Sequence, residues 1–372
     1  MGISGLNKFL RDTCPNVYEE IHISEYAYKK VAIDISLYLY VFKAAYQERW
    51  LKSFIQLVEC LRKYELHCVF IYDTGAPPEK EEERKERAAS RAKHEERVYR
   101  LEEAIDRFHE SGEVDPLLLE FQTKRKIKPK RLLRPDTGPV IDIKSIEFYV
   151  AKMKRQIFDV TKADFDLTKK LFDILDVPYF QAPLEAETCC SDLCKRGIVD
   201  AVLSRDSDVM AYGAPVFLTN LDISTGVCHR LHYDTILNEL NLTSDQFLDF
   251  CIMCGTDYNK NIFRVGPKTA YNKILNFGSI EEIDARTKLD ISILKHVRGR
   301  ELFRNYEQSD INVPYCGAPD FPKLAVFLKK HNINIPMEII KKSFVHTTIV
   351  FEDTDDEEEI ILEIENDVEV PA

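Results

Sequence analysis

The sequence lacks the features that would place the chain in a membrane. No stretch approaches the roughly 18 consecutive apolar residues that a membrane-spanning helix needs. The start, MGISGLNKFL, contains no basic segment followed by an apolar core, so it does not resemble a secretory leader. Leu6 stands where a myristoylation signal requires Ser or Thr. We therefore expect a soluble, intracellular protein with no membrane partner.

The sequence also lacks a disulfide framework, a zinc framework and an internal repeat. Its ten cysteines are scattered and lie mostly in apolar segments, which is typical of buried thiols in a reducing compartment. Cys251 and Cys254 form a CxxC with no matching second pair, which disfavours a zinc or redox role. The length of 372 residues predicts one large domain with insertions, or two domains.

The net charge of −12 is unevenly distributed along the chain. Residues 352–372 hold eleven acidic residues and no Lys or Arg, which leaves a net charge of −1 on the first 351 residues. The run Lys124–Arg131, together with Arg134, holds seven basic residues. This run fits a nuclear localisation signal, a nucleic-acid-binding patch or a solvated loop. The overall acidity therefore does not exclude a nucleic-acid partner.

Two pairs of carboxylates have i, i+2 spacing: Glu185 with Glu187, and Asp206 with Asp208. The first pair falls in the first turn of a predicted helix, where the helix dipole favours negative charge. The second pair follows a short apolar run that predicts a buried strand, and ligand sites of parallel sheets lie at this end of the strands. Four carboxylates meeting there would suit a hard cation such as Mg²⁺. The alternative is a helix cap and an Asp-rich turn without metal.

Three further carboxylates stand at comparable positions. Asp34 and Asp73 each lie at the end of a predicted buried strand, and Asp257 follows a predicted amphipathic helix over Ser244–Cys254. Six of the seven acids thus lie at a strand's carboxyl end or at a helix end, in an α/β pattern. Seven acids in one bowl make chemical sense around two divalent cations about 4 Å apart, a pair that assists phosphoryl displacement.

Residues 79–107 predict a long, charged helix, because the segment is nearly free of Gly and Pro. Five basic residues recur at steps of four and three, which places them on one stripe: Lys80, Arg84, Arg87, Arg91 and His94. A solvated, salt-bridged helix is one interpretation. A basic stripe directly after a candidate active-site Asp is also well placed to bind a phosphate chain.

A second candidate phosphate contact lies in Asn261–Asn276, which predicts a hairpin, a Gly-Pro step and a helix. Two helices joined through such a hairpin can present backbone N–H groups and Lys268 to a phosphodiester without reading bases.

The chain resembles the flap endonucleases of the XPG-type structure-specific 5′ nucleases, because it contains several short motifs of that family in the same order along the chain. The resemblance covers about residues 1–344 and is carried by MGISGL, VAIDISLYLY, VFIYDTGAPPEK, APLEAE, SRDSDVMAYG, GTDY and VGPKTA. It implies an α/β fold of the PIN-like 5′-nuclease type, with a mostly parallel central sheet flanked by helices, a helical arch and a helix-two-turn-helix clamp. The expected organisation is a nuclease region with the start of the arch (1–107), an insertion or linker (108–145), an internal nuclease region with the clamp (146–277), a C-terminal helical wrap (278–351) and an acidic tail (352–372).

The resemblance implies a role for each matching position. The metal ligands would be Asp34, Asp73, Glu185, Glu187, Asp206, Asp208 and Asp257. Lys80 and Arg87 would be the catalytic residues of the arch at the scissile phosphate. The DNA contacts would be Gly2, Tyr40, Arg84, Arg91, Gly255, Gly266 and Lys268, with Tyr40 stacking on the terminal base. The cofactors implied are two Mg²⁺ ions per chain, with Mn²⁺ as a substitute, and a potassium ion at the clamp.

The function implied is a Mg²⁺-dependent 5′ flap endonuclease that hydrolyses DNA phosphodiesters near single-strand/duplex junctions in replication or repair. We expect a monomer that acts on branched or flapped DNA in the nucleus, or in a host nucleus if the chain is viral. Two alternatives remain: a 5′–3′ exonuclease or junction resolvase of the same family, and a non-catalytic DNA-bridging protein. The seven acids together with Lys80 and Arg87 disfavour the bridging protein.

Four features depart from the family pattern. The interval from Asp73 to Glu185 is longer than in compact flap endonucleases, and we expect the extra length within 108–145, as a larger arch. Gln47 stands where the family usually has Arg, and Arg264 stands where the clamp hairpin usually has Gly. No QxxLxxFF sliding-clamp motif occurs near the C-terminus, and the partner of the acidic tail is left open.

Overall fold

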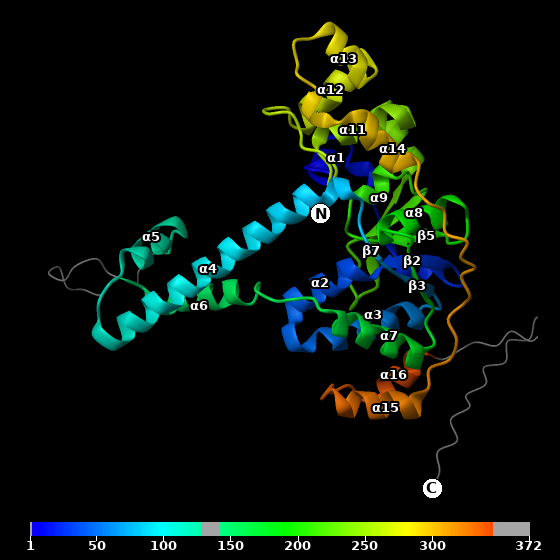
Figure 1. The fold of residues 1–372 in the computed structure, drawn as a ribbon. Coiled ribbons are helices and arrows are strands. Elements are labelled where there is room, and N and C mark those ends of the chain that lie inside the picture. The colour runs from blue at the N-terminus through cyan, green and yellow to red at the C-terminus, as the bar shows by residue number, and fades with distance from the viewer. Residues whose placement is uncertain (1, 128–140, 345–372) are drawn as a thin grey trace, which may run out of the picture.

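The body of the protein is built on a mixed seven-stranded sheet (Figure 1). The computed structural model describes residues 2–127 and 141–344. The strand order is β1-β7-β6-β5-β2-β3-β4. Strands β6, β5, β2, β3 and β4 are mutually parallel, whereas β7 is antiparallel to both β6 and β1. The strands are β1 (Glu19–His22), β2 (Lys30–Asp34), β3 (His67–Tyr72), β4 (Tyr179–Gln181), β5 (Ala201–Leu203), β6 (Val216–Thr219) and β7 (Val227–His232). The prediction of a mostly parallel central sheet is confirmed.

The central strands are apolar on both faces because each face is covered by helices. In β2, Val31 and Ile33 contribute to one buried core, and Ala32 between them contributes to the other. The first core is covered by α2 (Ile35–Tyr46), α3 (Trp50–Lys63), α7 (Lys162–Leu175), α15 (Phe321–Lys330) and α16 (Met337–Ser343). The second is covered by α1 (Leu6–Thr13), α8 (Ala186–Lys195), α9 (Asp208–Ala211), α10 (Tyr233–Leu240) and α11 (Ser244–Cys254). This two-layer covering explains the near-continuous apolar runs of the strands.

The second core continues into a helical end of the body, above α8 and α9 in Figure 1. There α11 contacts both α12 (Pro267–Phe277) and α14 (His296–Arg304), and α13 (Ile280–Arg286) packs on α12. Pro267 follows the N-cap residue Gly266, and at this first helical position its missing N–H removes no hydrogen bond. The predicted hairpin, Gly-Pro step and helix are therefore present.

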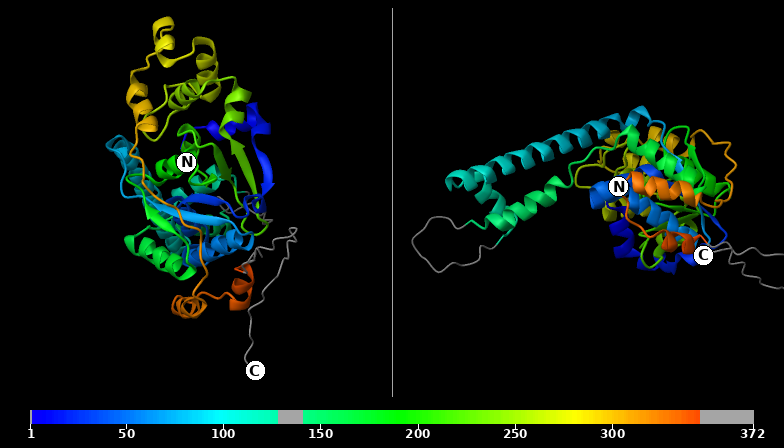
Figure 2. Two further views of the ribbon diagram at one scale, coloured as in Figure 1. Left: turned by 90° about the vertical axis from the view of Figure 1, so that its right-hand side faces the viewer. Right: turned by 90° about the horizontal axis from the view of Figure 1, so that it is seen from below.

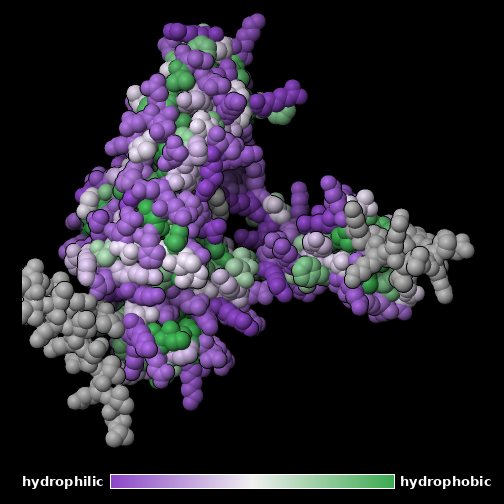
Figure 3. All heavy atoms as spheres, turned by 180° about the vertical axis from the view of Figure 1, so that it is seen from behind, coloured by the Kyte–Doolittle hydropathy of each residue, from purple (hydrophilic) through white to green (hydrophobic). Residues whose placement is uncertain are grey.

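A long helical arm projects from the body (Figures 1 and 2). It consists of α4 (Glu81–Ser111), α5 (Pro116–Lys124) and α6 (Ile143–Lys154). Val98, Leu101 and Ile105 of α4 form a small buried core with residues of α5 and α6. The space-filling view shows the arm joined to the body at one end only (Figure 3). The segment 108–145 therefore contributes α5 and the start of α6 to this arm.

The C-terminal part of the chain consists of separate helices. Residues 305–320, between α14 and α15, form no regular element. Backbone hydrogen bonds hold this stretch along the body, with Gly317 N donating to Asp176 O at 2.9 Å and Asp320 N donating to Ile174 O at 2.8 Å. Since these N–H groups bond to α7 and its end, they are unavailable to a helix of their own.

Two sequence features lie wholly or largely outside the described residues: the acidic tail at 352–372 and the second half of the basic run, from Lys128 onward. In the part of the chain that the structure describes, no helix combines the length and apolar character that crossing a bilayer requires.

Candidate metal and phosphate site

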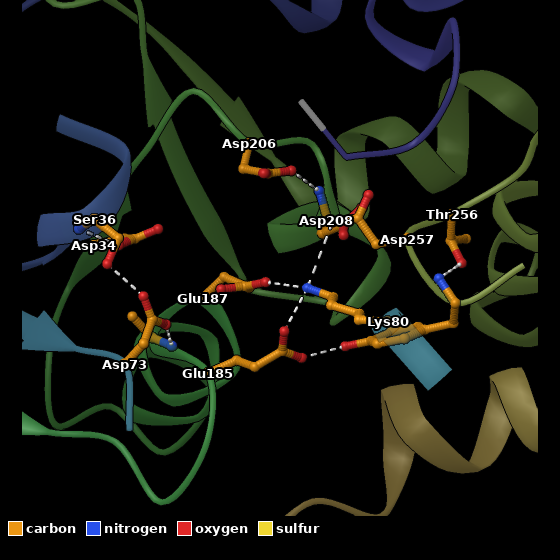
Figure 4. Close-up of polar contacts among 12 residues, drawn as sticks. Asp34, Ser36, Asp73, Lys80, Glu185, Glu187, Asp206, Asp208, Thr256 and Asp257 are labelled. Atoms are coloured by element: carbon orange, nitrogen blue, oxygen red, sulfur yellow. Dashed lines mark hydrogen bonds and ion pairs between the residues drawn. The ribbon is translucent and has the colours of Figure 1, made fainter. Parts of the chain in front are cut away.

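The seven predicted carboxylates surround one small volume at the carboxyl ends of the parallel strands (Figure 4). They come from β2, the chain just after β3, the start of α8, the β5–α9 connection, the first residue of α9 and the loop after α11. We call this group the acidic site; it consists of Asp34, Asp73, Glu185, Glu187, Asp206, Asp208 and Asp257.

Local hydrogen bonds fix the first two acids. Asp34 is the N-cap of α2, and its Oδ1 accepts from Ser36 N at 2.8 Å and from Leu37 N at 3.3 Å. Asp73 accepts from the Ser36 hydroxyl and, through Oδ1, from Ala186 N at 2.7 Å. Asp73 therefore caps α8 from the neighbouring strand end, and this contact joins segments 113 positions apart in the chain.

Lys80 lies among the acids and is almost fully buried. Its Nζ is 2.5 Å from Glu185 Oε1, 2.8 Å from Glu187 Oε1 and 3.5 Å from Asp257 Oδ2. Lys80 precedes the first residue of α4, so the base of the arm enters the acidic site directly. The solvated interpretation of the basic stripe is therefore wrong for its first residue.

Asp206 and Asp208 are held by the start of α9. Asp206 Oδ1 accepts from Asp208 N at 3.0 Å. The carboxylate of Asp208 is 1% exposed, and neither of its oxygens has a hydrogen-bond partner. Gly2 lies against this pair with φ +82°, and a Cβ added there would stand 2.0 Å from Asp206 Oδ1. The sequence prediction that placed Gly2 beside DNA thus corresponds to a position at the rim of the acidic site.

Asp257 connects the acidic site to the arm. Arg87 lies on α4, about two helical turns after Lys80. Its Nη2 donates to both carboxylate oxygens of Asp257 at 3.1 Å. Arg87 also pairs with Glu83 on its own helix. About half of the Arg87 side chain is exposed, so its guanidinium can still meet a ligand entering from solvent.

Burial and mutual repulsion disfavour ionisation across the acidic site. Burial, followed by the charges of Asp73 and Glu187, raises the pKa of Asp34 well above its ordinary value. The pKa of Asp208 is also raised well above its ordinary value, mainly by burial and next by the charge of Asp206. Burial, followed by the charge of Glu187, raises the pKa of Glu185 to about 7. Burial alone would lower the pKa of Lys80, but Glu187, Glu185 and the neighbouring aspartates outweigh it and raise that pKa.

The donor set suits divalent cations. All seven groups offer oxygen, which Mg²⁺ and similar hard cations prefer, and the unpartnered Asp208 oxygens are available for coordination. Within residues 2–127 and 141–344, no group of three or more Asp, Glu, His or Cys side chains is arranged so that it could hold a metal ion as it stands. The ammonium of Lys80 lies between Glu185 and Glu187 instead. Metal binding at these two acids would therefore require Lys80 to move aside.

The other predicted phosphate and base contacts are spread around the acidic site. Tyr40 is partly exposed on α2 and lines a cleft that also contains Arg11, Arg205 and Phe158. Arg84 is exposed on α4. Arg91 lies 3.9 Å from Asp159, and His94 contacts Met153 O at 3.1 Å, so the upper part of the stripe faces the α6 side.

The clamp residues lie close to the N-terminal segment. Gly255, at φ +94°, is closely packed against Asn261, and its carbonyl accepts from Ser4 N at 2.9 Å. Gly266 caps α12, and Lys268 is exposed in the first turn of that helix. The GTDY motif contains a further residue of the site, Tyr258, which the pattern of carboxylates does not indicate. Tyr258 donates to Glu185 Oε2 at 2.6 Å, and its ring lies 5.2 Å from Lys80 Nζ.

Comparison with known proteins agrees with this geometry. The XPG N-terminal domain matches residues 1–94, and the XPG I-region matches residues 176–257. The chain is 33% identical to a probable RAD2-like endonuclease, 369L, of Invertebrate iridescent virus 6, over 92% of each chain. It is 30% identical to flap endonuclease 1 of Anoplopoma fimbria, covering 76% of this chain and 68% of that one.

The fold has a counterpart among solved structures. The catalytic core of Rad2 in complex with DNA substrate matches with a TM-score of 0.63 at 17% identity, over 92% of this chain and 99% of that chain. At this identity the likeness concerns the fold. Together with the sequence matches, it defines a class: nucleases of the 5′-nuclease fold. The chain belongs to the XPG family of structure-specific nucleases, which includes the RAD2-like and flap endonucleases.

Proposed function

We propose that the chain is a Mg²⁺-dependent 5′ flap endonuclease that cuts DNA near single-strand/duplex junctions. The observation that carries this proposal is the gathering of seven carboxylates in one small volume at the base of a helical arm, where three of them pair with the buried ammonium of Lys80. One chain supplies every member of the site, so a monomer is sufficient.

The seven acids would form two groups, each of which holds one cation. Asp34, Asp73, Glu185 and Glu187 would hold one divalent cation, and Asp206, Asp208 and Asp257 a second. Cations bound there stabilise negative charge on the attacking and leaving oxygens of a phosphodiester. Burial of the acids supports this assignment, since closely placed carboxylates in a dry site favour a bound cation over ionisation without one.

Lys80 and Arg87 would bind the scissile phosphate. Both come from the base of the arm and face the acidic site, so a phosphate entering between the arm and the body meets two cations and the metal ligands together. On this proposal the ammonium of Lys80 leaves Glu185 and Glu187 and pairs with the phosphate instead. The guanidinium of Arg87 offers paired N–H groups, which fit two oxygens of one phosphate.

The test is cleavage of four substrates labelled at the 5′ end: a flap, a gap, a nicked duplex and a four-way junction. We expect Mg²⁺-dependent cleavage of the flap within a few nucleotides of the junction. Preferred cutting of the four-way junction, or stepwise release of single nucleotides, would assign the chain to a resolvase or an exonuclease. Asp206→Ala should abolish cleavage and leave flap binding largely intact. A chain that binds all four and cuts none in Mg²⁺ or Mn²⁺ would be a bridging protein.

A further inference from the structure

The hairpin between α11 and α12 carries the most exposed large apolar side chain of the described residues. Phe263 is 83% exposed at its tip. The guanidinium of Arg264 lies 5.1 Å from the centre of the Phe263 ring, so an aromatic and a cationic group stand side by side. A single exposed aromatic is common on protein surfaces, but here a guanidinium accompanies the ring at the tip of one hairpin.

The hairpin holds these two side chains outward. Ile262 and Val265 on either side are buried in the core, and Val265 N donates to Ile262 O at 2.9 Å across the turn. Asn261 Nδ2 donates to Val265 O at 3.2 Å and closes the base of the turn. Since both flanking residues are anchored in the core, the turn points Phe263 and Arg264 away from it.

The backbone at Arg264 is in a conformation that favours glycine. Its φ is +63°, in the left-handed region, where a side chain is disfavoured. A glycine would fit this turn with less strain, yet the chain places a long cationic side chain there. Strain of this kind is commonly retained where the side chain has a function.

The tip faces the side where the proposed substrate enters. In Figures 1 and 3 the loop between α11 and α12 projects on the same side of the body as the arm. Lys260, at its base, pairs with Glu86 of α4 and lies 3.3 Å from Glu82. Exposed Lys268, in the first turn of α12, adds positive charge beside the tip. DNA reaching the acidic site therefore passes close to the hairpin.

We propose that Phe263 and Arg264 enter the minor groove of the duplex next to the cleavage point. The inference rests on the proposed function, because it needs duplex DNA on this side of the molecule. An apolar ring can wedge against the base steps of a minor groove, and an Arg side chain is attracted by the negative potential there. The pair would read groove width and deformability, while α12 and Lys268 hold the backbone.

The test is binding to a fluorescent blunt duplex without divalent metal, so that cleavage plays no part. We expect Phe263→Ala to weaken binding about tenfold, in line with the loss of a ring packed on bases. Arg264→Gly should weaken binding several-fold while raising the Tm by about 2 °C, because glycine relieves the strained turn. The matched control is Val326→Ala, which removes an exposed apolar side chain of α15 at the other end of the body and should leave binding unchanged.

A minor-groove competitor locates the contact. Netropsin on an A·T-rich duplex should weaken binding of the unmodified chain and have several-fold less effect on the Phe263→Ala/Arg264→Gly double variant. Equal effects on both, or unchanged duplex binding by the single variants, would overturn the inference. If the chain cuts DNA but the Phe263 and Arg264 variants bind duplex normally, only this inference is overturned. If the chain does not cut DNA but the variants lose duplex binding as expected, only the proposed function is overturned.

Discussion

The Nζ of Lys80 lies 2.5 Å from Glu185 Oε1 in a site where both side chains are almost fully buried. Breaking a buried ion pair by removing one partner leaves an uncompensated charge and costs several kcal/mol. Here the partner that remains belongs to a group of acids that repel one another. Lys80 therefore stabilises the protein without metal, and a cation bound as we propose would compete with it for the same oxygens.

Replacing Lys80 should change stability and metal response in opposite directions. We expect Lys80→Met to lower the Tm without divalent metal by several degrees, because the acids lose their cation. The same variant should gain more from millimolar Mg²⁺ than the unmodified chain does, because binding no longer displaces an ammonium. Thermal denaturation with and without Mg²⁺ measures both effects. Equal Mg²⁺ shifts in the two proteins would show that Lys80 and the metal do not compete.

Asp208→Asn should separate stability from activity. The carboxylate is buried without a hydrogen-bond partner, and its pKa is raised by burial and by Asp206. Removing its charge should raise the metal-free Tm by a few degrees, yet lower flap cleavage on the order of 10³-fold. Asp245→Asn is a suitable control, because its carboxylate is exposed on α11 and should affect neither property. A Tm that falls in Asp208→Asn would mean that the carboxylate stabilises the fold.

The stabilisation by Mg²⁺ should increase with pH. Glu185 has a folded-state pKa of about 7, above its unfolded value near 4.3, so the folded chain retains a proton that the unfolded chain loses. The metal-free protein therefore loses stability as pH rises between about 4 and 7. Cation binding requires the ionised form, so the Tm shift caused by Mg²⁺ should be larger at pH 8 than at pH 6. A shift that is equal at both values would contradict the raised pKa.

Arg87→Ala should reduce cleavage much more than it reduces binding. The Arg87 guanidinium contacts Asp257 at 3.1 Å and faces the proposed phosphate position. Loss of one positioned donor costs on the order of 10²-fold in turnover. Lys85→Ala is the matched control, because Lys85 lies on the same helix but pairs only with exposed Glu81 among the described residues. Single-turnover cleavage and filter binding on one flap substrate separate the two effects; similar losses in both variants would point to general electrostatics.

Gly2→Ala should impair cleavage through the metal ligands. An added Cβ would lie 2.0 Å from Asp206 Oδ1, so the carboxylate would have to shift. We expect cleavage to fall by at least about tenfold, since small displacements at a reacting centre carry large rate penalties. Gly112→Ala is matched in backbone strain, with φ +72°, but its Cβ would meet nothing within 4 Å. Its cleavage rate should be unchanged, and equal rates in the two variants would place Gly2 outside the site.

Sequence patterns predicted those parts of the fold that depend on interactions between residues close together in the chain. Asp34 ends an apolar run and caps the following helix, and both facts follow from residues within a few positions. Gly266 and Pro267 marked the start of α12 in the same way. The acidic site was predicted because carboxyl ends of parallel strands meet at one edge of a sheet.

Other features depended on contacts that spacing does not encode. The Asp73 cap on α8 joins residues far apart in the chain, and Lys80 is buried although it begins a charge run typical of a solvated helix. The irregular path of residues 305–320 also depends on distant contacts, because the N–H groups of Gly317 and Asp320 bond to α7 and the residue that ends it. Arg91 continues the helical stripe of Lys80 and Arg87, but α4 carries it away from the body, to a contact near Asp159.

The base of the arm lies in the acidic site, so a small tilt there would move the far end of the arm much further. A helix of 31 residues such as α4 is about 46 Å long at the usual rise per residue. With Lys80 at its root, a tilt of about 5° there carries the far end through about 4 Å. Because the small core of Val98, Leu101 and Ile105 ties α5 and α6 to that end, they move with it as one piece. A change of partner at Lys80 that tilted α4 by this amount would therefore displace the far end of the arm by about the size of a nucleotide's sugar ring.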